Sequence, residues 1–328
     1  MNILLEGPYW MGQWTEIVDE ALRSLGHKTC LHYHNVKPLE FRLRKFIPGN
    51  SETLVEYSNS ELLKKGSQGG MDLLFSIQGK LDAATVHRLR EINPKLRIIY
   101  WFGDILLERA RQRVEEVYPL VDCLLLSYYD NYLEMRRTLG PKVGYFPFGV
   151  SQHYHCTVKS SRRDFNRYST DVAFVGTHYN ERDLLLGSLL IDSSAGVKVW
   201  GRGWRRSKLI RSKGRLSMTE TLKVYQNAKI SLNIHHQETQ NGFNMKFFEI
   251  PAAGGFQICD WQPELERLNL DGLVATYRDR DDLIDKIDYY LSREELRKEM
   301  SHKFKAYLFE NFRYDLRLNH LIENLEVD

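Results

Sequence analysis

The chain has little cysteine, and its cysteines are not arranged as in a disulfide framework. Its four cysteines are scattered over 328 residues, and no two of them form a Cys-x-x-Cys pair. Widely spaced cysteines are typical of reduced thiols in a cytoplasmic protein, whereas small secreted domains and structural zinc sites use clustered ones. We therefore expect a cytoplasmic protein without structural disulfides. The four are Cys30, Cys123, Cys156 and Cys259.

Long hydrophobic runs and a strong charge imbalance are also missing. No apolar stretch approaches the roughly 20 residues that a membrane-spanning helix needs. Residues 1–7 predict a strand and a glycine turn rather than a signal peptide. The 46 basic and 43 acidic residues leave a net charge of only +3. A nearly neutral chain does not favour nucleic acid as the partner.

Short hydrophobic runs are present, and they alternate with helical patterns. This alternation is typical of a parallel sheet covered by helices on both faces. Residues 37–70 are polar and irregular, and we assign no element to them. In the first half, the predicted strands are 3–5, 71–77, 96–102, 123–126 and 143–146, and the predicted helices are 14–25, 83–92 and 129–139.

The alternation pauses and begins again in the second half. Residues 151–170 are polar and lack periodicity, so we interpret them as an interdomain linker. We expect an α/β protein with two Rossmann-like domains, 1–150 and 171–312, facing each other across a cleft. A C-terminal helix in 313–328 is expected to pack back on the first domain. The second half predicts strands at 171–175, 197–200, 229–234, 256–259 and 273–277, and helices at 180–190, 219–227 (with Thr219 as N-cap), 279–291, 293–309 and 314–325.

The segment 242–260 carries the most informative pattern. Lys246 and Glu249 lie one turn apart in a predicted helix that is followed by a glycine pair and a short strand. A cation at a helix N-terminus can hold a diphosphate, and a carboxylate can accept hydrogen bonds from a ribose diol. The pair therefore suits a sugar nucleotide. The alternative is a surface ion pair on an ordinary helix.

Six short motifs carry a family resemblance: DVAFVG (171–176), WGRGW (200–204), YQNAKISLN (225–233), NMKFFE (244–249), AAGG (252–255) and DDL (281–283). With these motifs, residues 171–312 resemble glycosyltransferases of the CgeB-like group, within the GT-B superfamily. The first half resembles a GT-B acceptor domain only in layout. The resemblance implies a nucleoside diphosphate sugar as substrate, bound mainly by the second domain, and no bound metal or other cofactor.

The resemblance also assigns residues to the donor. Glu249 stands where these enzymes have the ribose-binding Glu, the second acid of an E-x7-E pattern. Asn241 replaces the first acid, and Lys246 stands where the family often has Arg. Because Pro removes a helical hydrogen bond, we expect a kink at Pro251. The complete predicted donor site is Gly176, Thr177, Arg182, Gly201, Asn241, Asn244, Lys246 and Glu249.

Four of these residues are predicted from their place in the fold. The pair Gly176 and Thr177 follows a strand, where backbone N–H groups can approach a phosphate. Arg182 lies in the following helix, within reach of a diphosphate, and Gly201 follows the next strand. The alternatives are a tight turn, a solvated helix face and simple turn packing.

The first domain supplies candidates for the acceptor and the base. The loop with Gly7, Tyr9, Trp10 and Gly12 follows the first strand and resembles the glycine loop of GT-B enzymes. It is not a Gly-x-Gly-x-x-Gly fingerprint, so hydride chemistry is not indicated. Its aromatic rings either stack on a sugar or pack in the core. Asp104 follows a strand and is the predicted catalytic base, with a helix N-cap as the alternative.

Histidines and basic runs complete the candidates. His178 and His235 are alternative bases. The pairs 153/155 and 235/236 lack further ligands at metal spacing, so we expect no metal site. Two basic runs are either solvated loops or surfaces for an anionic membrane or a charged acceptor. They are Arg42, Arg44 and Lys45, and Arg202, Arg205, Arg206, Lys208, Arg211, Lys213 and Arg215.

The sequence thus predicts a metal-independent glycosyltransferase that moves a sugar, with UDP as the expected carrier, to a hydroxyl of a glycan, lipid-linked or protein acceptor. We expect it in the cytoplasm or peripherally at the inner membrane face, with no nucleic acid partner. Two alternatives stay open. One is another sugar-nucleotide enzyme, such as an epimerase, and the other is a non-catalytic protein that binds a nucleotide sugar.

Overall fold

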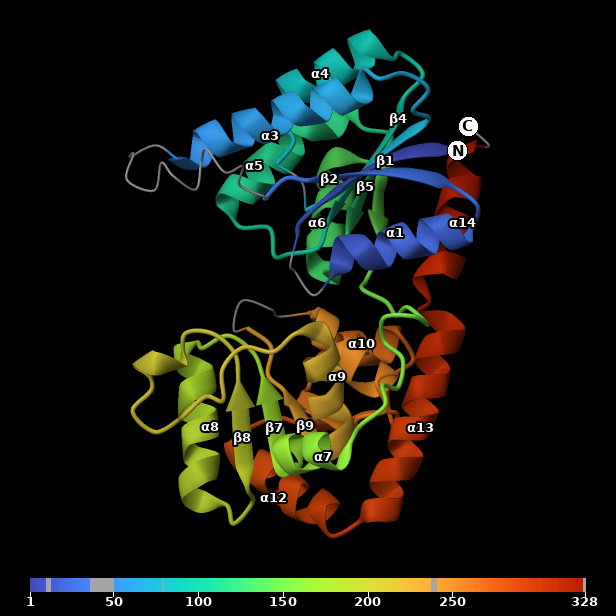
Figure 1. Ribbon diagram of the computed structural model, residues 1–328. Coiled ribbons are helices and arrows are strands. Elements are labelled where there is room, and N and C mark those ends of the chain that lie inside the picture. Colours follow the sequence, from blue (N-terminus) through green and yellow to red (C-terminus); the bar gives the residue numbers. More distant parts are fainter. Residues whose placement is uncertain (10–12, 36–49, 79, 237–240, 327–328) are drawn as a thin grey trace. The chain divides into compact units, whose positions relative to one another are not determined.

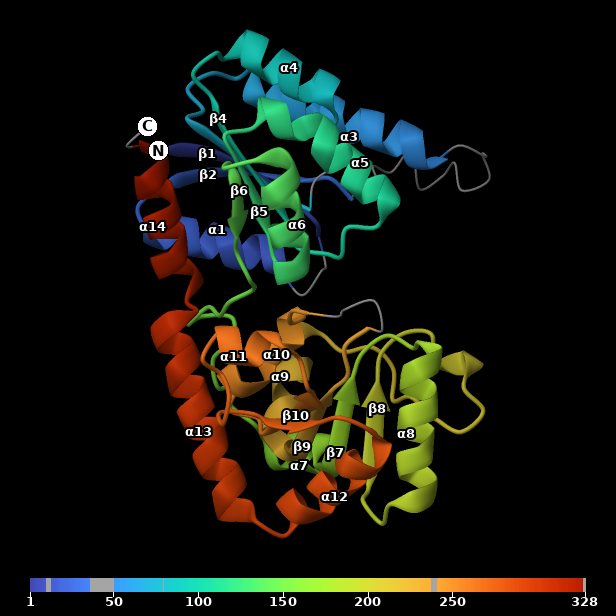
Figure 2. The same ribbon diagram turned by 180° about the vertical axis from the view of Figure 1, so that it is seen from behind.

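The computed structural model describes residues 1–9, 13–35, 50–78, 80–236 and 241–326. The chain divides into two compact units (Figures 1 and 2). Unit 1 comprises Met1–Pro147 together with Tyr314–Asp328, and unit 2 comprises Phe148–Arg313. Each unit is built around its own parallel sheet, so the predicted α/β class with two Rossmann-like domains is confirmed.

The six strands of unit 1 pair in the order β2-β1-β3-β4-β5-β6, and every pairing is parallel. Strand β3 is buried over its whole length, as expected for a parallel sheet with both faces covered. The order changes direction between β1 and β3, which makes that position the switch point of this sheet. The strands are β1 (Asn2–Gly7), β2 (Lys28–Tyr33), β3 (Leu73–Ile77), β4 (Arg97–Phe102), β5 (Cys123–Leu126) and β6 (Val143–Tyr145).

Helices cover both faces of this sheet. On one face, α1 and α14 pack against each other (Figure 1), and the ring of Trp101 contacts Trp14 of α1 and Tyr314 of α14. On the other face, α3, α4 and α5 cover a core that includes Leu74 and Tyr100. The helices are α1 (Trp14–Ser24), α3 (Asn50–Gly66), α4 (Ala83–Ile92), α5 (Glu108–Val117), η1 (Tyr118–Leu120), α6 (Tyr129–Leu139) and α14 (Tyr314–Glu326).

Unit 2 has a five-stranded parallel sheet in the order β11-β10-β9-β7-β8. Its switch point lies between β7 and β9. The strands are β7 (Thr170–Val175), β8 (Val197–Trp200), β9 (Ala228–Asn233), β10 (Gln257–Asp260) and β11 (Ala275–Tyr277). The helices are α7 (Arg162–Tyr168), α8 (Asn180–Asp192), η2 (Trp204–Arg206), α9 (Met218–Asn227), α10 (Met245–Ala252), α11 (Glu264–Arg267), α12 (Arg280–Leu291) and α13 (Glu294–Asn311).

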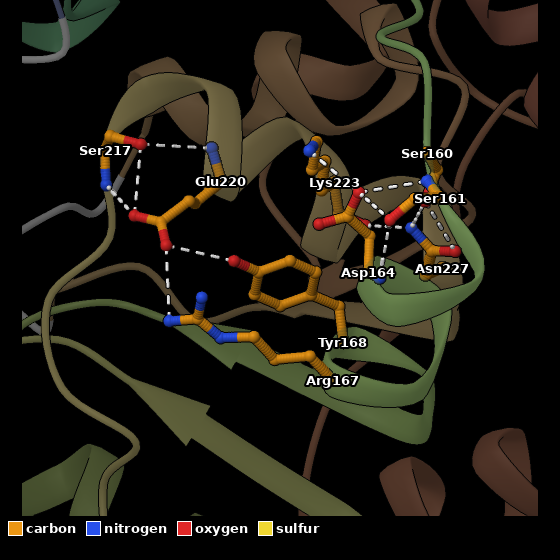
Figure 3. A network of polar contacts seen from close by, with 9 residues as sticks. All are labelled: Ser160, Ser161, Asp164, Arg167, Tyr168, Ser217, Glu220, Lys223 and Asn227. Carbon is orange, nitrogen blue, oxygen red and sulfur yellow. Dashed lines mark hydrogen bonds and ion pairs between the residues drawn. The ribbon is translucent and has the colours of Figure 1, made fainter.

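The polar segment 151–170, predicted as a linker, lies in unit 2 and contains helix α7. A network of polar contacts joins α7 to α9 (Figure 3). Lys223 Nζ lies 2.9 Å from Asp164 Oδ2, and the Tyr168 hydroxyl donates to Glu220 at 3.0 Å. Ser161 and Asp164 also form a capping box at the start of α7. A helix of only seven residues has too few turns to show periodicity, which explains the difference from the prediction.

Other differences from the predicted elements are local. Strand β2 was not predicted, and its mixed, partly exposed residues lack a clear apolar run. Helix α9 begins with Ser217 as N-cap, because Ser217 accepts from the backbone N–H of Glu220. The prediction that Thr219 is the N-cap was wrong by two residues. Among the described residues, no helix combines the length and the apolar character that a bilayer crossing needs.

Candidate functional site

In unit 2 the carboxyl ends of the five strands lie at one edge of the sheet, because all pairings are parallel. The loops after β7 and β9 flank the switch point, where ligands of open α/β sheets bind. The predicted donor residues all lie in loops or helices that follow these strands, at Gly176–Arg182, at Gly201 and at Asn241–Glu249. The fold therefore brings them to the same edge.

Arg182, on α8, braces the two loops at the switch point. Its Nε and Nη2 donate to the carbonyl of Ile234 at 3.1 and 2.6 Å, and its Nη1 donates to the carbonyl of Thr177 at 3.1 Å. Burial lowers the pKa of its guanidinium. With these bonds Arg182 fixes the loops after β7 and β9. The guanidinium N–H groups that do not bond to Ile234 or Thr177 are the ones left for a diphosphate. The contact of Arg182 with a diphosphate stays a prediction.

Two glycines allow the loops after β7 and β8 to touch. Gly201 has φ +137°, and a Cβ there would lie 1.8 Å from the carbonyl oxygen of Gly176. The same oxygen accepts a hydrogen bond from Trp204 Nε1 at 2.8 Å. Any larger residue at Gly201 would separate the two loops. Turn packing, the alternative role of Gly201, therefore fits this geometry, and its contact with the donor stays a prediction.

The start of helix α10 is fixed to the end of β9. Asn244 is the N-cap, and its Oδ1 accepts from the backbone N–H of Phe247 at 3.2 Å. Its Nδ2 donates to Asn233 Oδ1 at 3.0 Å. Asn241 lies three residues before this cap. The positive end of the α10 dipole is thus held at the carboxyl edge of the sheet.

Lys246 and Glu249 lie one turn apart on α10, as predicted, but they do not form a surface ion pair. The Glu249 side chain is buried, at 6% exposure, and Lys246 is half-buried. Among the described residues, neither side chain has a hydrogen bond or an ion pair within 4.0 Å. A buried carboxylate without donors is unfavourable unless a ligand supplies them.

The electrostatics of this pair follow from burial. Burial raises the pKa of Glu249, and the Lys246 ammonium offsets only part of that rise. Burial lowers the pKa of Lys246, Glu249 opposes this, and Arg182 adds to it. The site therefore holds a carboxylate and an ammonium that both lack direct partners in the described structure. Hydroxyl donors and anionic oxygens are the groups that would satisfy them.

Asp260, which was not predicted from the sequence as a site residue, orients His235 at the same edge. His235 Nδ1 lies 2.8 Å from Asp260 Oδ1, and the backbone N–H of His235 donates to the same oxygen at 2.9 Å. Burial raises the pKa of Asp260, but the contacts with His235 and Gln262 outweigh it and leave the pKa below its usual value. The signal was present in the sequence, because Asp260 ends the strand β10.

In unit 1, the described residues of the predicted acceptor loop, Gly7 and Tyr9, lie at the switch point after β1. Gly7 ends β1, and a Cβ there would lie 2.2 Å from Thr15 Oγ1. Tyr9 is 40% exposed, and its ring centroid lies 5.1 Å from that of Tyr33. Trp10 and Gly12 lie outside the described residues.

Asp104 lies two residues after β4, at the same carboxyl edge, and its side chain is exposed. Its Oδ1 accepts from the backbone N–H of Ile105 at 2.9 Å. Helix α5 has Leu107 as its N-cap, so the alternative role of Asp104 as a helix cap is wrong. The position suits a base, and that role stays a prediction.

Gln78 was also missed by the sequence analysis. It follows β3 at the switch point and has φ 52°, a conformation that non-glycine residues rarely adopt. Its Oε1 accepts from the backbone N–H of Gly103 at 2.9 Å. Strained residues cluster at functional sites, and Gln78 couples the loop after β3 to the loop that carries Asp104.

The histidine pairs and the two basic runs were the remaining candidates from the sequence. Within the described ranges, no group of three His, Cys, Asp or Glu residues could hold a metal ion. His155 is buried, which lowers its pKa to about 4, and its Nδ1 accepts from the backbone N–H of Ser151. The basic run at 42–45 lies outside the described residues, whereas the run at 202–215 forms an exposed loop after β8.

Residues 182–323 match a family model described as glycosyl transferase-like. No curated protein matches the chain. Similar solved structures include a glycosyltransferase from Rickettsia africae, with 12% identity and a TM-score of 0.69 over 99% of this chain and 97% of that chain. Anabaena Alr3699/HepE in complex with UDP and glucose has 10% identity and a TM-score of 0.66 over 100% of both chains. Trehalose-6-phosphate synthase OtsA has 11% identity and a TM-score of 0.71 over 99% of both chains.

At these identities, the likeness to the solved structures establishes the fold, which is the GT-B fold predicted from the sequence. The family match covers α10 and the loop after β9, which carry the candidate donor residues Asn241, Asn244, Lys246 and Glu249. The match and the fold together identify the chain as an enzyme of the glycosyltransferase class, with GT-B architecture.

Proposed function

We propose that the protein transfers a sugar from a nucleoside diphosphate sugar, with UDP as its carrier, to a hydroxyl group of an acceptor. The Glu249 side chain is buried one turn from Lys246, and no described residue donates a hydrogen bond to its carboxylate; this observation carries the proposal. UDP as carrier is favoured by the Anabaena protein of the same fold, which was solved with UDP and with UDP-glucose.

The donor would be held by groups of unit 2. Glu249 would accept hydrogen bonds from the ribose hydroxyls, because an ionised carboxylate only accepts. Lys246 and the N-terminus of α10 would bind the diphosphate and stabilise the negative charge that develops on it as the sugar leaves. These groups can take over leaving-group stabilisation, so we propose a reaction without a metal ion or another cofactor.

The finer assignments belong to this proposal as well. We place the protein in the CgeB-like group and assign it a glycan, a lipid-linked molecule or a protein as the acceptor. Asp104 would take the proton from the acceptor hydroxyl. Gly7 and Tyr9 would contact the acceptor, and the cytoplasm is the proposed location.

A screen of nucleotides tests the donor. UDP, GDP, CMP and dTDP, with their sugars, would be added to the full chain while its thermal unfolding is followed. A ligand at one hundred times its Kd stabilises the folded state by about 2.7 kcal/mol. We expect UDP and a UDP-sugar to raise the Tm and the others to raise it less. No shift with any nucleotide would contradict the proposal.

Turnover separates the alternatives. Incubation of the chain with the bound donor and a panel of acceptors should release the free nucleotide and form a glycosylated product. Binding without release would indicate a non-catalytic binding protein. Conversion of the donor sugar into an isomer, with the nucleotide still attached, would indicate an epimerase.

A further inference from the structure

Helix α8 is apolar on two sides. Leu186 and Leu189 are fully buried in the core of unit 2, whereas Leu184 and Ile191 are 76% and 69% exposed. Residues seven apart lie on the same face of a helix, so the exposed pair forms a line along the outer side of α8. A helix with apolar residues on both faces usually has a partner on its outer face.

A neighbouring loop extends this line. Leu209 is 56% exposed, and its Cδ1 would lie 3.0 Å from a Cβ built on Gly187. Gly187 lies midway between the two exposed residues of α8, so Leu209 packs over the middle of the helix. We refer to Leu184, Leu209 and Ile191 as the apolar stripe. Exposed apolar side chains that adjoin one another in this way are candidates for an interaction site.

The loop that carries Leu209 is strongly basic. It projects beside one end of α8 at the β8 edge of the sheet (Figures 1 and 2). Seven cations in 202–215, with no acid between them, are exposed and have no hydrogen bond or ion pair from their side chains to any described residue. We call them the basic loop: Arg202, Arg205, Arg206, Lys208, Arg211, Lys213 and Arg215.

The basic loop has a fixed form. Trp204 and Ile210 are buried in the core, and the backbone N–H of Gly201 donates to Gly214 at 2.9 Å. Four arginines of the loop line a hollow of about 680 Å³. They are Arg202, Arg205, Arg206 and Arg215. Like charges held together repel one another, so an anionic partner would stabilise this arrangement.

The acidic residues of α8 do not neutralise the basic loop. Asp183 lies 3.3 Å from His178 Nε2, and Glu181 lies 3.8 Å from His236 Nε2. Asp192 pairs with Arg280. The cations near the apolar stripe therefore keep their charge uncompensated within the described chain.

We propose that the apolar stripe and the basic loop form a docking surface for a bilayer that contains anionic phospholipids. The cations would bind lipid phosphates, and the leucine and isoleucine side chains would enter the boundary between headgroups and acyl chains. The combination favours a bilayer over a nucleic acid, since a nucleic acid would leave the apolar stripe in water. This inference does not depend on the donor or on turnover.

Vesicle flotation tests the docking surface with the full chain. Vesicles of phosphatidylcholine, with and without 30% phosphatidylglycerol, would be used at about 0.1 M and 0.5 M salt. We expect binding to the anionic vesicles only, weakened by the higher salt. Binding that is absent, or equal on neutral vesicles, would overturn the proposal.

Substitutions in the basic loop and in the apolar stripe test whether these residues bind the vesicles. We expect Arg205→Ala/Arg206→Ala/Arg211→Ala to weaken binding about a hundredfold, from roughly fivefold for each cation. Leu184→Ser/Leu209→Ser should weaken it about tenfold or more. All these side chains are exposed, and thermal unfolding would verify that the variants fold.

A matched control comes from α7, where Arg162, Arg163 and Phe165 are also exposed. Arg162→Ala/Arg163→Ala/Phe165→Ser should change vesicle binding less than twofold. Equal losses in this control, or wild-type binding by the folded loop and stripe variants, would overturn the assignment. A soluble protein that binds this surface while vesicles do not would also contradict it.

Discussion

At the scale of single residues, Glu249 is the residue on which the proposed donor site depends. The fold buries the Glu249 side chain at the carboxyl edge of the sheet, and no described residue donates a hydrogen bond to its carboxylate. The Lys246 ammonium offsets part of the negative charge of Glu249 by a coulombic interaction, without a hydrogen bond. Such an arrangement costs stability in the free protein, and it is explained when a ligand provides the hydrogen bonds.

The pKa of Glu249 predicts how this cost depends on pH. Because burial raises the pKa in the folded state, the folded chain binds more protons than the unfolded chain above about pH 4.3. Stability therefore falls as the pH rises through the interval between the unfolded and folded pKa values. We expect Glu249→Gln to gain stability relative to the wild type across that interval. Urea unfolding at several pH values would measure it, and a difference independent of pH would contradict the raised pKa.

Gly201 gives a second prediction at this scale. Gly201→Ala should lower the free energy of unfolding by about 2–4 kcal/mol, because the new Cβ would meet the carbonyl oxygen of Gly176. Gly272→Ala is the control, since Gly272 also has a positive φ of +77° but open space around it. It should cost about 1 kcal/mol. Urea unfolding with equal losses would show that φ alone, and not the close approach, requires Gly201.

The sequence predicted the helix that carries Lys246 and Glu249, but it did not predict the tertiary contacts around that helix. The helical spacing correctly placed Lys246 and Glu249 on one helix after a strand. Burial of Glu249 could not be predicted, because it depends on the elements packed around α10. The braces made by Arg182 and Asp260 join residues 52 and 25 positions apart, and no local pattern reveals such pairs.

At the scale of elements, substitutions can distinguish the two residues considered as N-cap of α9, Ser217 in the structure and Thr219 in the sequence. Ser217→Ala should lower the free energy of unfolding by about 1 kcal/mol, because Ser217 caps the helix and anchors Glu220 in the network with α7. Thr219→Ala, at the exposed position that the sequence favoured, should change it by less than about 0.5 kcal/mol. Chemical unfolding of both variants measures the difference. Equal effects would contradict the cap assignment.

The strands that the sequence predicted were those with continuous apolar runs. β3 and β4 are almost fully buried, so each appears in the sequence as a nearly continuous run of apolar residues. β2 is partly exposed and mixed in composition, and α7 is one short helix whose stability comes from contacts with α9. For these two elements, tertiary packing rather than local pattern determines the structure.

At the scale of the whole molecule, the chain leaves unit 1 at Pro147 and returns to it at Tyr314. Tyr314 and Leu318 of α14 are buried, and Tyr314 contacts Trp101. Truncation after Arg313 should therefore expose the core of unit 1 and leave the core of unit 2 covered. Hydrogen exchange should show faster exchange in β1, β3 and β4 and little change in β7 and β9. Unchanged exchange in unit 1 would contradict this dependence on α14.

In the proposed function, Glu249 binds the ribose of a nucleotide sugar. Calorimetric titration of UDP into the wild type, Glu249→Gln and the exposed control Glu266→Gln tests it most directly. Loss of a charged acceptor that pairs with two hydroxyls should weaken binding by about 2–3 kcal/mol, or thirtyfold or more. The account predicts that loss for Glu249→Gln and wild-type affinity for Glu266→Gln. Equal affinity in all three proteins would contradict it.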